Sequence, residues 1–333
     1  MVSTSNLNTV REVTRPTTLS SPHYLTTSLL RSYFELHFIV LIWGFTAILG
    51  KLILIPAPEL VFVRTALAAP GLALVMVLMG ERRAFRVSRA DLARLLATGA
   101  LIAAHWLLFF ASARVANVSI SLAGLSTASL WVALLEPLFN GKRLRGFEIA
   151  LALGIVAGLY LIFRFEFSHV VGLLMGVGSA LFAALFSLLN ARYTQRLAGT
   201  TISFYELTGA CLSAALFFPL YLAGGLSKTG HLELHLTAWD WLWITLLAWA
   251  CTVYPFAASV RLMRRLSTFA MSLTVNLEPV YGIILARLIF GESEKLTDGF
   301  YLGTAVIIVC VAAHPIVESR LRRLSAAEAV VPR

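Results

Sequence analysis

Charged residues are scarce in this sequence. Only 13% of its 333 residues are Asp, Glu, Lys or Arg, and 59% are hydrophobic. Soluble globular chains contain about 25% charged residues and about 45–50% apolar ones. A chain with so little polar surface cannot cover itself in water. The composition therefore excludes an ordinary soluble protein and predicts an integral membrane protein.

Cysteine is also scarce. The three cysteines, Cys211, Cys251 and Cys310, all fall inside apolar runs. Their spacing matches neither a disulfide framework nor a zinc motif. Free cysteines in such surroundings pack as small apolar side chains.

The motifs of several enzyme and pump classes are missing. The chain contains no HExxH, no GxSxG, no Asp-rich pair and no nucleotide-binding loop. His231, Glu233 and His235 alternate in one polar segment, but they lack the fourth ligand of a typical metal site. We therefore expect no enzymatic activity, no cofactor and no metal, and no ATP-driven pumping by this chain alone.

Apolar stretches long enough to cross a bilayer, about 20 residues each, occupy most of the chain. There are ten of them: 34–55, 58–80, 92–113, 117–139, 147–164, 170–190, 201–223, 241–262, 267–290 and 299–317. The segments between them are short and polar, so no soluble domain fits. The sequence predicts an all-α fold with ten transmembrane helices, a disordered cytoplasmic tail at 1–33 and a second cytoplasmic tail at 318–333.

Basic residues set the expected orientation. When the N-terminus is placed inside, most of the 27 Lys and Arg residues fall on the inner side. Cytoplasmic loops are enriched in these residues. We therefore predict a multi-pass protein of the cell (inner) membrane with both termini in the cytoplasm. The net charge of +10 follows from this asymmetry and indicates no nucleic-acid partner.

Ten spans with both termini in the cytoplasm are consistent with an internal repeat of five helices. Each half, 34–165 and 169–317, would contain five helices, so the second half would be inverted. "LSTASLWVALLEPLFNGKRL" (125–144) aligns without gaps on "LEPVYGIILARLIFGESEKL" (277–296), which places Ser126 opposite Glu278. Inverted-topology repeats are the architecture of many secondary transporters.

These features resemble those of the drug/metabolite transporter superfamily, EamA type. The resemblance rests on "LIWGFTAILGK" with Trp43 and Lys51, on Arg64 early in the second span, on "NLEPVYGIILARLIFGE" and on the Gly303-containing helix. It covers about residues 34–317. It implies two inverted five-helix repeats, a central cavity, and export or exchange of small metabolites such as amino acids.

Glu278 is the first candidate for binding or coupling. It lies near the middle of its span, and an ionised side chain at the bilayer centre costs roughly 2.5–3.5 kcal/mol on insertion scales. Such a group normally faces a partner or a wet cavity. Pro279 removes a backbone donor next to it, so a carbonyl in the same helix would need another partner. We expect Glu278 either to face the cavity and bind a cation or a proton, or to be tied structurally to a neighbouring helix.

Three further ionisable residues are candidates. Arg64 lies within the second span, where it would bind a carboxylate or phosphate, or pair with an intramembrane acid. Lys51 lies near the outer end of the first span and would bind substrate or reach to the interface. Glu206 aligns with Arg64 in the second half, although it is expected toward the opposite face.

Four other candidates lie at mid-depth. His105 and Trp106 in the third span, and Tyr254 in the eighth, would line the cavity or pack between helices. Asn276, close to Glu278, would add a hydrogen bond on the same approach.

The sequence thus predicts a secondary transporter, an exporter or exchanger of a small polar metabolite, that works by alternating access in the lipid bilayer. An amino acid or related organic ion is the foremost substrate class. A lipid flippase, a scaffold and a membrane-embedded enzyme are the alternatives. Proton coupling, the direction of transport and the oligomeric state stay open.

Overall fold

A computed structural model describes residues 22–116, 118–141, 143–163, 170–290 and 298–328, which form helices and turns without a strand. The first repeat region contains α1 (Pro22–Leu52), α2 (Ala57–Leu78), the 3₁₀ turn η1 (Arg82–Phe85), α3 (Arg89–Val115), α4 (Val118–Leu125), α5 (Ala128–Asn140) and α6 (Gly146–Phe163). The second contains α7 (Val170–Tyr193), α8 (Gly199–Ala223), α9 (Ala238–Ala248), the π-helical turn η3 (Trp249–Val253), α10 (Tyr254–Leu262), α11 (Thr268–Val275), α12 (Glu278–Phe290) and α13 (Asp298–Glu328).

Helices lie at all ten predicted stretches. Seven stretches in the described residues run through helices long and apolar enough to cross a membrane. The fifth stretch forms the shorter α6, and the fourth and ninth are each divided into two short helices. The all-helical membrane fold is confirmed, whereas the count of ten complete crossings stays a prediction.

The two divided stretches break at corresponding places. A two-residue turn, 126–127, separates α4 from α5, and another, 276–277, separates α11 from α12. These turns place Ser126 opposite Asn276, so the gapless alignment that paired Ser126 with Glu278 was wrong by two residues. Few identities anchor this alignment, so the sequence alone does not reveal a register error of two residues.

Pro279 does not interrupt a helix, contrary to the expectation from the sequence. It is the second residue of α12, which begins at Glu278. Proline is tolerated in the first turn of a helix, because its missing N–H has no intrahelical partner there. The break before Glu278 therefore removes the strain that a proline within one long helix would cause.

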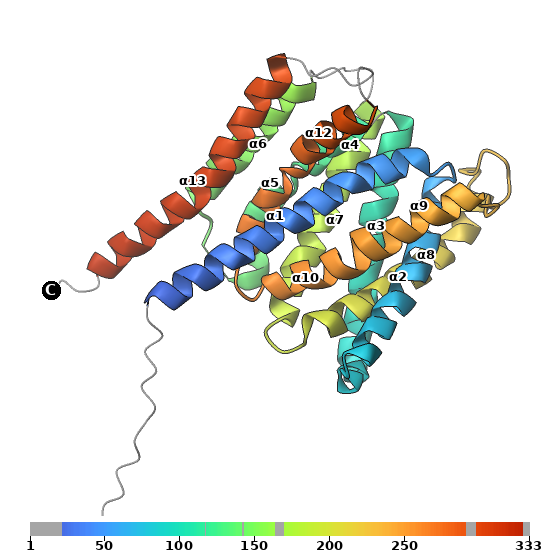
Figure 1. The fold of residues 1–333 in the computed structure, drawn as a ribbon, viewed down its shortest axis with the longest axis horizontal. Coiled ribbons are helices and arrows are strands. Elements are labelled where there is room, and N and C mark those ends of the chain that lie inside the picture. The colour runs from blue at the N-terminus through green and yellow to red at the C-terminus, as the bar shows by residue number, and fades with distance from the viewer. Residues whose placement is uncertain (1–21, 117, 142, 164–169, 291–297, 329–333) are drawn as a thin grey trace, which may run out of the picture.

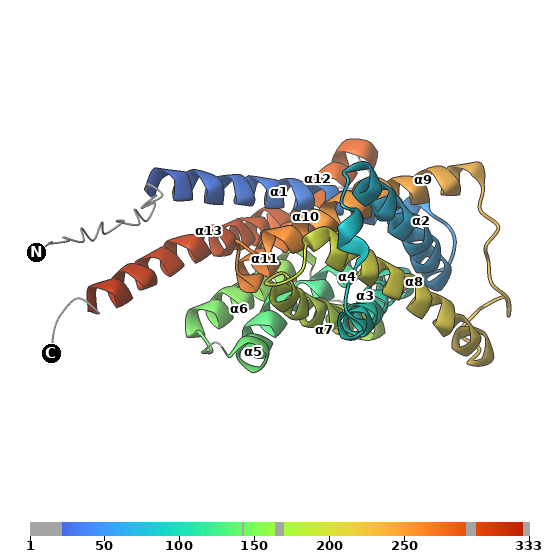
Figure 2. The ribbon, with the colours of Figure 1, turned by 90° about the horizontal axis from the view of Figure 1, so that it is seen from below.

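The helices of the two halves pack on each other in pairs. α2 lies against α8 and α6 against α13, which are the second and fifth members of each half (Figure 1). α1 packs on α12, and α7 packs on α3, α4 and α5. The first turns of α1 and the last turns of α13 extend from the same end of the bundle (Figure 2).

Glycines bring some of these helices into backbone contact. A Cβ at Gly99 of α3 would lie 2.3 Å from the carbonyl oxygen of Glu206, and one at Gly209 of α8 would lie 2.4 Å from that of Leu96. Gly124 and Gly176 meet in the same way between α4 and α7. Small residues at helix crossings are typical of membrane bundles, where close van der Waals packing drives association.

Large apolar side chains cover the outside of the bundle. Phe34, Leu138, Leu216 and Leu288 are each at least 75% exposed. Such a surface would be unfavourable in water and suits contact with lipid tails.

Candidate functional site

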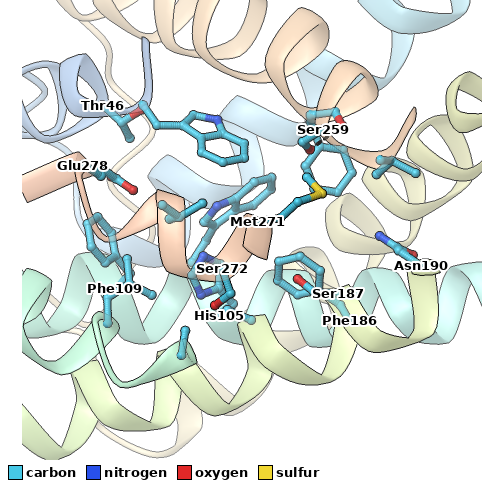
Figure 3. Close-up of a pocket in the computed structure, with 18 of the residues that line it drawn as sticks. Thr46, His105, Phe109, Phe186, Ser187, Asn190, Ser259, Met271, Ser272 and Glu278 are labelled. Atoms are coloured by element: carbon cyan, nitrogen blue, oxygen red, sulfur yellow. Dashed lines mark hydrogen bonds between the residues drawn. The ribbon is translucent and has the colours of Figure 1, made fainter. Parts of the chain in front are cut away.

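A central cavity of about 140 Å³ lies between the two halves of the chain (Figure 3). Its lining comes from α1 to α5 and from α7, η3, α10, α11 and α12. Most lining side chains are apolar or aromatic. The polar ones are Thr46, Arg64, His105, Ser187, Asn190, Thr252, Ser259, Thr268, Ser272 and Glu278. Arg64 and Glu278 are the two residues of this lining with formal charges.

Arg64 is held rigidly on α2. Its Nε donates a hydrogen bond to the Thr252 hydroxyl at 2.8 Å, and that hydroxyl donates to the Leu247 carbonyl oxygen at 2.7 Å. Thr252 lies in η3, and π-helical turns occur often at functional sites. The Nη1 atom of Arg64 is buried and has no hydrogen-bond partner in the described residues. The arginine therefore presents an unused donor within the cavity wall.

Aromatic rings surround the same guanidinium. The Cζ atom of Arg64 lies 4.1 Å from the centroid of the Trp106 ring and 6.0 Å from that of Phe110. The Trp106 ring in turn lies near Phe256, at 6.2 Å between centroids. A cation stacked on an indole ring and removed from water gains about 2 kcal/mol. This contact contributes to the stability of a charged group inside the bundle.

Glu278 reaches the cavity from the first turn of α12. Its side chain is 7% exposed. Within the described part of the chain, this side chain makes no hydrogen bond or ion pair. The positive end of the helix dipole favours a negative charge at this position. In the close-up view, Glu278 and Asn190 lie at opposite sides of the cavity (Figure 3).

His105 both lines the cavity and bonds to a helix. Its Nδ1 lies 3.0 Å from the Ser179 carbonyl oxygen and 2.8 Å from the Ser179 hydroxyl, on α7. The same hydroxyl lies 2.9 Å from the His105 carbonyl oxygen. These bonds fix the ring, so His105 positions the wall between α3 and α7.

Glu206 lies behind the cavity wall. It is completely buried, and the Asn190 side-chain amide donates to its Oε2 at 3.0 Å. Asn190 itself lines the cavity. The Oε1 atom of Glu206 and the Oδ1 atom of Asn190 are buried without a hydrogen-bond partner in the described residues. A second carboxyl group therefore lies one hydrogen bond from the cavity.

The other predicted residues lie elsewhere. Tyr254 is 44% exposed and stacks edge-on with Phe38, so it does not line the cavity. Asn276 is buried, but its amide donates to the Ser129 hydroxyl at 3.2 Å and joins the two broken helices. Lys51 belongs to α1, and its side chain lies outside the described residues.

Several lining residues were missed from the sequence. Thr252, Ser259 and Ser272 look like ordinary small residues of apolar helices, and only the rotation of each helix brings them to the cavity. Thr252, which lies three residues before Pro255, was the available signal in the sequence for the irregular turn at η3.

The geometry defines a class of protein: an integral membrane bundle with a largely apolar cavity between its halves that contains an arginine and a glutamate. The chain belongs to the EamA-like transporter family, whose model matches residues 33–164 and 170–313. This confirms the family resemblance and the two-repeat organisation. The protein is thus a multi-pass membrane transporter.

The chain is also similar to a bacterial transporter and to a protein of known structure. The chain is 25% identical over 248 residues to the uncharacterized transporter YxxF of Bacillus subtilis (strain 168). The aligned region covers 73% of this chain and 76% of that protein. A protein of known crystal structure matches with a TM-score of 0.70 at 17% identity, covering 89% of this chain and 99% of that one. The second likeness shows the fold alone.

Proposed function

We propose that this protein is a secondary transporter, an exporter or exchanger, for a small zwitterionic metabolite such as an amino acid. One observation carries the proposal. The central cavity contains one arginine and one glutamate, and no ion pair joins them. Two opposite charges held apart in one cavity form a site for a molecule that carries both charges.

Arg64 would bind the carboxylate of the substrate. Its Nε is already bonded to Thr252, so the N–H groups of its two Nη atoms remain for a ligand, and Nη1 has no partner among the described residues. A buried donor without a partner costs about 1–3 kcal/mol. A substrate carboxylate that accepts from this donor would recover that cost.

Glu278 would bind the ammonium group or a proton. Its carboxylate lines the cavity and has no bonded partner among the described side chains, so it is available to either. Exchange between the two occupants would couple substrate movement to a proton. Glu206, behind Asn190, would be a second acceptor along such a route.

The size and lining of the cavity support a small substrate with an apolar part. A volume of about 140 Å³ is close to the roughly 150 Å³ of a protein cavity that admits benzene, so it suits a solute of about six non-hydrogen atoms. Trp43, Phe109, Phe186 and Met271 would contact its side chain.

Alternating access would use the two broken helices. α4–α5 and α11–α12 meet through the bond between Asn276 and Ser129, and α2 packs on α8 and α6 on α13. Rocking of one inverted half on the other would open the cavity to each side in turn. With basic residues concentrated at the end where α3 begins, both termini would lie in the cytoplasm of an inner-membrane protein.

Counterflow into proteoliposomes tests the substrate class. A preloaded amino acid would be challenged outside with three matched compounds: the amino acid, the amine without its carboxylate, and the acid without its amino group. We expect the zwitterion to compete at least about tenfold better than either analogue, since each analogue leaves one charge unpaired. Equal competition by all three would contradict the proposal. Transport of labelled phospholipid would favour the flippase, and chemical conversion of the substrate would favour an enzyme.

A further inference from the structure

A second pocket lies outside the central cavity. It has a volume of about 520 Å³ and is lined by Arg94, Leu189, Arg192, Tyr193 and Arg196. Arg94 lies in the second turn of α3, and Arg192 lies in the last turn of α7. Since α3 packs on α7, the pocket gathers three guanidinium groups at one end of the bundle.

Little negative charge balances these groups. Asp91 contacts Arg196 at 2.6 Å and Arg94 at 3.4 Å. Arg192 is exposed, and its side chain makes no hydrogen bond or ion pair within the described part of the chain. Three positive charges against one negative leave an excess of two, concentrated on one pocket.

The form of the pocket matches a phosphate group at a membrane surface. Guanidinium groups bind phosphate through two parallel N–H bonds, and several around one anion give selectivity over a monovalent carboxylate. Basic pockets between helices at the cytoplasmic side of a membrane are typical binding sites for phosphorylated lipid head groups. Leu189 adds an apolar wall, which suits the glycerol and acyl part of a lipid.

We propose that the pocket of Arg94, Arg192 and Arg196 binds the phosphate group of an anionic lipid or of a free phosphate compound. Bound phosphate would link the start of α3 to the end of α7. Both helices line the central cavity, α3 through His105 and α7 through Asn190. The ligand would thereby stabilise the arrangement of these two helices. The proposal is independent of the substrate that the cavity carries.

Thermal unfolding of the full-length protein in neutral detergent provides the test. Phosphatidylglycerol, inorganic phosphate and phosphatidylcholine would be titrated separately. We expect phosphatidylglycerol, inorganic phosphate or both to raise the unfolding midpoint by several degrees and phosphatidylcholine to have no such effect. A shift with phosphatidylglycerol alone identifies a lipid, and a shift with inorganic phosphate identifies a free phosphate source. No shift with either would overturn the proposal.

Arg192→Gln and Arg82→Gln form a matched pair of variants. Each removes one exposed guanidinium group that makes no hydrogen bond or ion pair within the described residues, and Arg82 lies in η1, outside the pocket. We expect Arg192→Gln to weaken binding of the active compound about tenfold, as loss of one charge-assisted contact implies. Arg82→Gln should change it less than twofold. An equal effect of both variants would show that binding depends on the overall positive charge of the surface and not on this pocket, which would overturn the proposal.

Discussion

The guanidinium of Arg64 stacks on the indole ring of Trp106, with its Cζ 4.1 Å from the ring centroid. The Thr252 hydroxyl accepts from Nε on the same group. Stacking and a hydrogen bond thus hold the charge in place, while Nη1 stays without a partner. The arrangement prepares an anion-binding donor before any substrate arrives, which lowers the entropy that binding would cost.

Replacing Arg64 with lysine should weaken substrate binding although the positive charge remains. Lysine has no planar fork, so it cannot bond Thr252, stack on Trp106 and reach the substrate together. We expect the apparent KM for counterflow to rise at least about tenfold. Arg114→Lys is the control, because Arg114 bonds the Ile55 carbonyl oxygen outside the cavity. A similar rise in both variants would contradict the role of Arg64.

Trp106→Leu should also raise the apparent KM, since leucine keeps an apolar side chain but removes the aromatic face. The lost cation–π contact is worth about 2 kcal/mol when desolvated, so a change of about tenfold or more is expected. Trp239→Leu serves as a control, because Trp239 is 66% exposed. Unchanged transport in Trp106→Leu would show that the stacking does not position Arg64.

The bond between Asn276 and Ser129 should couple the two broken helices. Single changes to alanine and the double change define a thermodynamic cycle, and hydrogen bonds between membrane helices contribute about 0.6 kcal/mol on average. We expect a coupling energy of about that size in the free energy of unfolding. Purely additive effects would show that the bond does not stabilise the junction.

Gly99→Ala should destabilise the bundle. The new Cβ would lie 2.3 Å from the Glu206 carbonyl oxygen and 2.7 Å from Ala210 N, so α3 and α8 must separate. Overpacking of this kind costs about 1–3 kcal/mol. A Cβ at Gly146 meets no atom within 4 Å, so Gly146→Ala should leave the unfolding midpoint nearly unchanged. Equal midpoints for both variants would contradict the observed α3–α8 packing.

The sequence alone predicted the all-helical membrane fold, because apolar stretches of about 20 residues are typical of helices that cross a bilayer. It also singled out Arg64 and Glu278, since charges inside such stretches require a special environment. Both line the cavity, together with His105 and Trp106. Their roles in binding remain predictions.

Other details depend on helix rotation and on breaks, which apolar composition does not encode. Tyr254 and Trp106 both lie in apolar runs, yet one faces outward and the other lines the cavity. α3, which contains Trp106, has no distinct polar face, so its sequence does not show which side is turned to the cavity. The turn before Glu278 was missed because Asn276 and Leu277 carry no strong breaking signal, and Pro279 suggested a kink instead.

Counterflow of one zwitterionic amino acid by the parent, Glu278→Gln and Glu59→Gln tests the central claim most directly. Both glutamates are buried, but Glu59 accepts a hydrogen bond from the Glu233 backbone N–H and lies outside the cavity. We predict that Glu278→Gln reduces counterflow at least about tenfold while Glu59→Gln retains it. Undiminished counterflow in Glu278→Gln would contradict a substrate site at Glu278.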